Sequence, residues 1–304
     1  MLVSEHPVAA ARRSTTGLWL LVSAGVLWGT GGPSGSLLAL ETGLSPLAVA
    51  AYRLAIGGVL IVVPLVLSRR PLPRGRRAWT RITVLGMLAA AFQACFFAAV
   101  SLTTVSLATL LTIGASPVLV LSAEWITGRR RISRPVVSTV ALAVTGLALL
   151  VGASSSDRTT SGVLAGAALA LLSAGGFATM TFVSARPVPG LDDLAATGLG
   201  FTIGAALLAP LAAGTSGMSF TPGWASIGLL LLLGTAPTAV AYTLYFRGLR
   251  TTPAGTAALM ALLEPLVGTV LAAWILDDRL SPTGLIGAGL LTTALLLHAR
   301  HSHP

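Results

Sequence analysis

Apolar residues follow one another in ten long runs, separated by short polar or arginine-rich segments. Each run lasts about 20 residues, and a helix of that length, rising 1.5 Å per residue, crosses a hydrocarbon core of roughly 30 Å. The runs are too long for the roughly ten-residue strands of an outer-membrane barrel. The pattern therefore predicts ten transmembrane helices, at residues 18–38, 46–67, 82–101, 107–126, 135–152, 162–184, 194–213, 225–246, 254–276 and 282–299.

Composition supports an all-α integral membrane protein. The chain is 54% hydrophobic and 9% charged, with a mean hydropathy of +0.88, whereas a soluble domain has roughly 25% charged residues. Cys95 is the single cysteine, so no disulfide framework is expected. His6, His301 and His303 fall in the tails and His298 at the end of the last helix, where we expect solvated side chains. We predict neither a metal site nor a cofactor.

The arginines test the helix count independently. The chain has no lysine, and with a cytoplasmic N-terminus, Arg158 and Arg279 fall outside while Arg53 lies within a helix. The other sixteen fall inside, as the positive-inside rule requires. They are Arg12, Arg13, Arg69, Arg70, Arg74, Arg76, Arg77, Arg81, Arg129, Arg130, Arg131, Arg134, Arg186, Arg247, Arg250 and Arg300. We therefore expect a multi-pass protein of the cytoplasmic (inner) membrane with cytoplasmic tails at 1–17 and 300–304.

This topology also explains the net charge of +10. The excess arginine reflects orientation in the membrane, and no nucleic-acid partner is predicted. Membrane lipid is a predicted partner, because the arginine-rich 69–81 loop could contact anionic head groups.

The chain repeats itself with a shift of 148 residues. Residues 103–133 contain Thr-Thr, a proline, a tryptophan and Arg-Ile-Ser, and residues 251–281 contain Thr-Thr, Pro, Trp and Arg-Leu-Ser in the same order. The pattern predicts two five-helix repeats, at 18–152 and 162–299. Because five is odd, the second repeat enters the membrane in the opposite sense, which makes an inverted repeat with a substrate site near the midplane.

Glycine and proline mark where these helices bend or touch. We predict kinks or hinges at Gly29 and Pro33 in the first helix, and at the corresponding residues Pro117 and Pro265. The simpler reading is that proline is common in membrane helices. Gly25 and Gly29 are spaced for close helix packing. The small-residue surfaces of the fifth and tenth helices could serve either a homodimer or an internal contact.

Two charges at membrane depth carry most of the functional signal. Glu264 lies about 15 Å into the ninth helix and Arg53 roughly 10 Å into the second, by the rise per residue. Such charges are costly and usually mark a transport pathway or a ligand contact. Either the two residues pair, as a permanent salt bridge between helices, or they share a wet cavity.

Four further residues are candidates for substrate binding. Trp28 and Gln93 fall near the midplane by the same count. Tryptophan at that depth lies outside its usual interfacial belt. Phe97 and Tyr242 could add aromatic lining to the same cavity. The predicted substrate-binding residues are Trp28, Arg53, Gln93, Phe97, Tyr242 and Glu264.

Three segments resemble the EamA-type proteins of the drug/metabolite transporter superfamily. They are YTLYFRGLRTTPAGTAALMALLEP from Tyr242 to Pro265, SPLAVAAYR ending at Arg53, and Trp28-Gly29. The resemblance covers nearly the whole chain. It implies a ten-helix inverted-repeat exporter of small metabolites, often amino acids, with a central cavity formed by both repeats. Family members often carry an acidic residue just after the fourth and ninth helices, where this chain has Arg130 and Asp278.

The expected function is secondary transport, with a small-molecule substrate exported by alternating access. Proton coupling would use Glu264, because burial disfavours the charged form of a carboxyl group, whereas facilitated diffusion needs no such group. Multidrug or secondary-metabolite efflux is an alternative. An intramembrane enzyme and a membrane scaffold are alternatives of other classes, but no catalytic residue is predicted, because Asp192-Asp193 and Asp277-Asp278 are loop pairs without further spaced acids.

Overall fold

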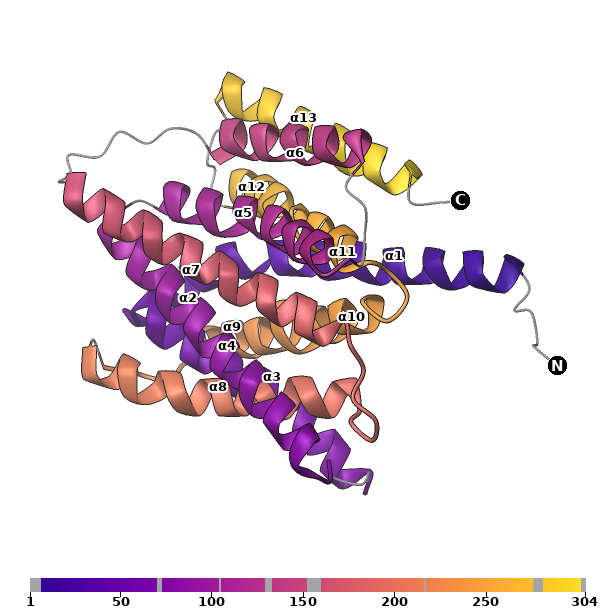
Figure 1. Ribbon diagram of the computed structural model, residues 1–304. Helices are drawn as coiled ribbons and strands as arrows, with labels where there is room; N and C mark the ends of the chain where they lie inside the picture. The colour runs from indigo at the N-terminus through magenta and orange to yellow at the C-terminus, as the bar shows by residue number, and fades with distance from the viewer. Residues whose placement is uncertain are drawn as a thin grey trace.

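A computed structural model describes residues 7–69, 73–103, 105–128, 133–151, 160–215, 217–275 and 281–301. Within these ranges all regular structure is helical, and the helices lie side by side in one bundle (Figure 1). The start of α1 and the end of α13 are on the same side of the bundle (Figure 1). Arg130 and Asp278 lie outside the described residues.

Helices occupy all ten predicted positions, three of them as consecutive pieces. The elements are α1 (Pro7–Gly29), α2 (Gly31–Thr42), α3 (Pro46–Leu67), α4 (Arg76–Leu102), α5 (Val105–Ile126), α6 (Arg134–Val151), α7 (Thr160–Ser184), α8 (Asp193–Thr215), α9 (Trp224–Gly234), the π-helix η1 (Thr235–Val240), α10 (Ala241–Gly248), α11 (Ala254–Met260), α12 (Leu263–Ile275) and α13 (Pro282–His301).

Eight of these segments are long and apolar enough to cross a membrane, counted over the described residues. The first predicted span, which Thr30 divides between α1 and α2, is not among these eight. Within the described residues, Arg134–Leu150 of α6 counts as a shorter apolar helix. A multi-pass membrane protein is thus supported, while ten crossings stay a prediction.

Three helices are interrupted inside the bundle. Thr30 separates α1 from α2, η1 separates α9 from α10, and Ala261 and Leu262 form a turn between α11 and α12. The last break has a direct cause, because Pro265 has no N–H for the carbonyl of Ala261. The N–H of Glu264 donates to that carbonyl instead, at 3.0 Å. In contrast, α5 runs without interruption through Pro117.

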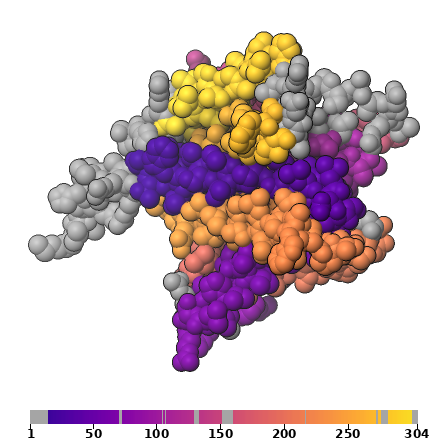
Figure 2. Space-filling view, turned by 180° about the vertical axis from the view of Figure 1, so that it is seen from behind, coloured from indigo at the N-terminus to yellow at the C-terminus, as the bar shows by residue number. Residues whose placement is uncertain are grey.

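The most extensive helix contacts join the two predicted repeats. In the first repeat α1 packs on α10 and α12, α3 on α8, α4 on α7 and α8, and α6 on α13. In Figure 2, α1 crosses the visible face between α13 above and α9–α10 below. The α1–α10 and α4–α7 contacts pair the first helix of one repeat with the third of the other. The two halves therefore interlock, and neither forms a core by itself.

Glycines allow these close crossings. A Cβ on Gly29 would lie 2.5 Å from Cβ of Val267, so α1 packs directly on α12. A Cβ on Gly287 would lie 2.6 Å from the carbonyl oxygen of Gly146 and 2.3 Å from the backbone nitrogen of Leu150. The surfaces of α6 and α13 thus meet each other, which answers the open question for this pair of helices in favour of an internal contact.

One minor prediction was wrong. His298 is not a solvated side chain at the end of α13, because it is only 4% exposed. Its Nε2 lies 3.0 Å from Oγ1 of Thr256 in α11. This contact joins the last helix to the interrupted ninth span.

The close packing of α6 on α13 can be tested by adding one methyl group at Gly287. Gly287→Ala should destabilise the protein by about 1–3 kcal/mol, because the added Cβ meets rigid backbone atoms. The measurement is unfolding of the purified protein in mixed micelles with increasing SDS. Gly289→Ala on the same helix is the control, since nothing lies within 4 Å of its added Cβ. Equal stability of the two variants would contradict the tight contact.

Candidate substrate site between the two repeats

Trp28 occupies the centre of a group of aromatic rings contributed by both repeats. It is 3% exposed, and its ring centroid lies 4.9 Å from those of Tyr242 and Tyr245. The centroid of Phe177 is 5.9 Å away. We call Trp28, Phe177, Tyr242 and Tyr245 the aromatic cluster. It joins α1 of the first repeat to α7 and α10 of the second.

The local sequence of α10 explains how the cluster forms. Tyr242 and Tyr245 are three residues apart, a spacing that places both rings on one face of a helix. Phe246 extends this face, with its ring 5.8 Å from Tyr245. The hydroxyl of Tyr245 lies 2.9 Å from Oγ1 of Thr181, which fixes α10 against α7.

The indole N–H of Trp28 is buried and has no acceptor in the part of the chain that the structure describes. A buried donor that stays unpaired costs roughly 1–3 kcal/mol. The natural acceptor for it is a group that arrives from outside the protein, a bound solute or an ordered water.

Arg53 on α3 contacts the π-helix of the opposite repeat. Its Nε donates to Oγ1 of Thr238 at 3.3 Å, and its Nη2 donates to the carbonyl of Pro237 at 3.5 Å. Thr238 in turn donates to the carbonyl of Leu233 at 2.7 Å. These bonds satisfy backbone groups where Pro237 and the wider π-turn disturb the regular pattern.

Glu264 begins α12 at the break in the ninth span. It is half-buried, and among the described residues its carboxylate has neither a hydrogen-bond nor an ion-pair partner. Tyr242 and Arg53 are within electrostatic range of it. Glu264 therefore faces the region between the repeats with its charge unpaired.

Arg53 and Glu264 do not form the salt bridge that was one of the two sequence-based hypotheses. Within the described part of the chain, Arg250 and Asp193 form an ion pair, whereas Arg53 bonds to η1. The guanidinium of Arg53 donates instead to a threonine hydroxyl and a backbone carbonyl. The two charges share a region without neutralising each other directly.

The first repeat shows the contrast. Ser116 stands where the 148-residue shift places Glu264. It is 2% exposed, and its hydroxyl donates to the carbonyl of Thr112 at 2.6 Å within its own helix. The first repeat therefore has a hydroxyl that bonds within its own helix at this position. The second repeat has a carboxylate that bonds to no other described residue.

The remaining predicted residues fall at different places. Gln93 on α4 is 4% exposed and makes no hydrogen bond with any described residue. Phe97 packs on Phe96, with centroids 5.2 Å apart, and not on the aromatic cluster. Gly29 ends α1, and Pro33 lies in the first turn of α2, where its missing N–H costs no helical bond.

Sequence reasoning missed several contacts of this site. Thr181 and Thr238 are ordinary helix threonines in the sequence, and nothing in their surroundings signals that they bind Tyr245 and Arg53. Phe201, with its centroid 4.7 Å from Tyr242, was equally hidden. Phe246 could have been found, because it lies four residues after Tyr242 on the same helix face.

Comparison with known proteins decides the family. The model of the EamA-like transporter family matches twice, at residues 15–152 and 164–300. The chain belongs to the EamA-like transporter family. It is also 31% identical over 281 residues to a Bacillus subtilis (strain 168) protein named "Uncharacterized transporter YwfM", covering 92% of each chain.

A solved crystal structure, titled simply as that of a protein, shares the fold. Its TM-score is 0.78 at 17% identity, over 95% of this chain and 99% of the other. The family and the relative's name indicate a membrane transporter rather than an enzyme.

The Arg53 contact predicts a stability effect. Thr238→Val removes the hydroxyl that accepts from Arg53 and donates to Leu233, so it should cost about 1–3 kcal/mol. Thermal unfolding in detergent measures the loss. Thr293→Val is the matched control, because that exposed threonine bonds only to the carbonyl of Gly289 in its own helix. A Thr238 variant as stable as the control would show that the contact is dispensable.

Proposed function

We propose that this EamA-family protein is a secondary transporter that exports small polar metabolites, such as amino acids and related compounds, by alternating access. The observation that carries the proposal is the unpaired Glu264 carboxylate beside the aromatic cluster, between the repeats. A charge inside a membrane helix is costly when it has no partner. A positively charged group of the solute would supply the missing partner.

A zwitterionic solute matches both charges of the site. Its ammonium group would bind Glu264, and its carboxylate would bind Arg53. Nε and Nη2 of Arg53 donate to η1, so Nη1 would be the donor to the solute. The indole N–H of Trp28 offers a third contact. Aromatic rings would enclose the apolar part of the solute, with a cation–π contribution to its ammonium group.

The breaks in the helices are the proposed hinges of the transport cycle. Discontinuous helices at the midplane are typical of transporters whose two repeats rock against each other. Here Thr30, η1 and the Ala261–Leu262 turn lie in helices that touch the site. We assign hinge roles to Gly29, Pro33 and Pro265 beside these breaks, and to Pro117 as the counterpart of Pro265 in the first repeat.

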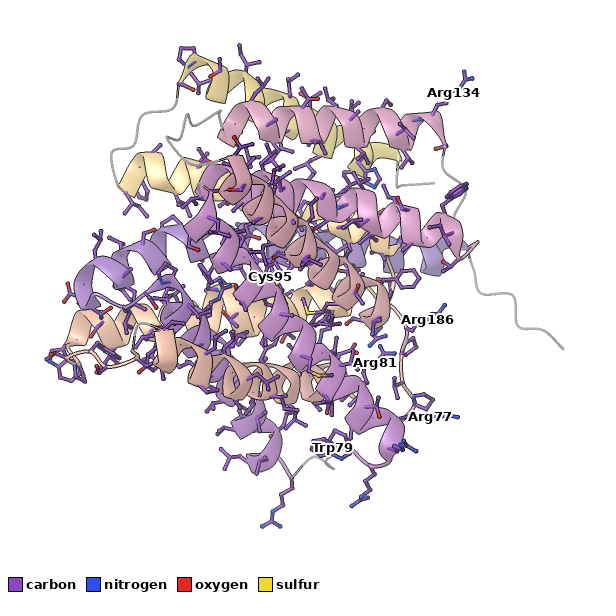
Figure 3. The ribbon with its side chains drawn as sticks, turned by 60° about the vertical axis from the view of Figure 1, so that its left-hand side comes forward. Arg77, Trp79, Arg81, Cys95, Arg134 and Arg186 are labelled. Carbon is purple, nitrogen blue, oxygen red and sulfur yellow. The ribbon has the colours of Figure 1, made fainter. Side chains whose placement is uncertain are left out.

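The proposed membrane is the cytoplasmic membrane, with both termini in the cytoplasm. Arg77, Arg81, Arg134 and Arg186 all lie at one end of the bundle (Figure 3), as expected for a cytoplasmic face. Trp224, 94% exposed at the start of α9, and Trp19, 65% exposed on α1, suit the membrane–water interface. We call the end that carries these four arginines the arginine-rich end.

Reconstitution tests the function directly. Purified protein in liposomes is assayed with a panel of radiolabelled amino acids and amines, and lipophilic cations are added because the aromatic cluster would also favour them. We expect uptake above that of protein-free liposomes for at least one polar amine. Inside-out membrane vesicles should accumulate that solute and right-side-out vesicles should not. Accumulation only in right-side-out vesicles would reverse the proposed direction.

Glu264 is the proposed proton carrier. A carboxylate can bind either a proton or the ammonium group of a solute, so solute and proton can compete for Glu264. Glu264→Gln should lower accumulation driven by a pH gradient by at least about tenfold while keeping solute–solute exchange. Glu41→Gln, at the exposed end of α2, is the control. Undiminished uphill accumulation by the Glu264 variant would exclude proton coupling through this residue.

Trp28→Phe tests whether the solute accepts a hydrogen bond from the indole N–H of Trp28. Phenylalanine keeps an aromatic ring but lacks the N–H, so KM should rise by roughly 5-fold for one lost hydrogen bond. Trp224→Phe is the control, because that side chain is 94% exposed at the start of α9. Unchanged KM values in both variants would mean that no solute bonds to the indole.

A further inference from the structure

A second polar site lies at the arginine-rich end of the bundle, away from Glu264. It is an open pocket of about 20 Å³ where α4, α7, α8 and α10 meet. Three guanidinium groups line it, from Arg81, Arg186 and Arg250, together with the single carboxylate of Asp193. The side chains lining the pocket therefore carry an excess of two positive charges.

The carboxylate is already engaged. Asp193 binds Arg250 through both oxygens, with the Nε–Oδ2 contact at 2.8 Å. This pair leaves Arg81 and Arg186 without a carboxylate partner among the described residues. Arg81 lies within electrostatic range of both Arg186 and Arg250, so three like charges are held together. An anion in the pocket would relieve that repulsion.

Donors for such an anion are in place. Arg81 uses Nη1 for the carbonyls of Val183 and Arg186, so its other N–H groups remain for a ligand. The guanidinium of Arg186 lies over the ring of Phe182, 5.8 Å from its centroid. Planar guanidinium groups fixed in this way suit the bidentate recognition of carboxylate and phosphate oxygens.

Ser184 gives an independent indication of a ligand. It lines the same pocket at the end of α7 and is only 5% exposed. Its Oγ has no hydrogen-bond partner among the described residues. Helix-terminal serines usually bond to nearby backbone, so a buried hydroxyl that does not do so marks a place where an outside acceptor is missing.

We propose that Arg81, Arg186 and Ser184 form a binding site for an oxyanion, either the phosphate of an anionic lipid or a soluble phosphate or carboxylate. The pocket is open, and its volume of about 20 Å³ leaves room for about one water-sized group, such as an oxygen of the anion. We assign it an anchoring or regulatory role, distinct from the proposed solute site.

The experiment measures thermal unfolding of the full chain in a neutral detergent. In one arm, sodium phosphate replaces sodium chloride at constant ionic strength. In the other, phosphatidylglycerol or phosphatidylcholine is added to the micelles. A ligand at about ten times its dissociation constant should raise the unfolding temperature by roughly 3 °C. A response to phosphate identifies a soluble anion, and a response to phosphatidylglycerol alone identifies the lipid phosphate.

Two variants test the residues. Ser184→Ala removes a hydroxyl with no protein partner, so it should leave the unliganded protein as stable as wild type and abolish at least half of the ligand-induced shift. Arg81→Gln should abolish the shift. Arg77→Gln is the matched control, because Arg77 is exposed one turn earlier on α4 and points away at the same end (Figure 3).

Two results overturn the proposal. One is the absence of any shift with phosphate or phosphatidylglycerol in the wild-type protein. The other is an equal shift in wild type, Ser184→Ala and Arg77→Gln, which would indicate diffuse charge screening. Neither arm measures transport, so the outcome is independent of the proposed function.

Discussion

The structure depends on the close approach of helix backbones from opposite repeats. Gly29 against Val267 and Gly287 against Gly146 leave no room for a side chain. In a membrane, helices gain little from the hydrophobic effect on meeting, so contacts of this kind supply the packing energy. Because the main contacts join repeat to repeat, the fold is one interlocked unit.

Breaks in the helices place two charged residues of the candidate site. Arg53 on α3 donates to the carbonyl of Pro237 in the π-helix η1. The break before Pro265 puts Glu264 at the start of α12, where its carboxylate bonds to no other described residue. Arg53, which the sequence marks as a charge of the transport pathway, thus also holds two segments of the fold together.

The two charged regions of the protein differ in kind. Arg53 and Glu264 have opposite signs and do not bond to each other. At the arginine-rich end, Arg81 and Arg186 have the same sign and share a small pocket with an unbonded serine. The region of Arg53 and Glu264 suits a solute that binds and is then released. The pocket of Arg81 and Arg186 suits an anion that stays bound, because the two positive charges repel each other when the pocket holds no anion.

Sequence alone was enough to predict a helical membrane protein, ten helix positions, two repeats and the family, because the length of apolar runs and the order of breakers are local properties. It also singled out Trp28, Arg53 and Glu264 by depth. Only the tertiary structure decided their partners. Arg53 bonds to Thr238, Phe97 packs on Phe96, and Gly146 meets Gly287 inside one chain. Those contacts depend on how each helix is rotated and where it crosses its neighbours. The periodicity of apolar residues does not specify this, because a membrane helix is apolar on all sides and its sequence does not show which side faces a neighbour.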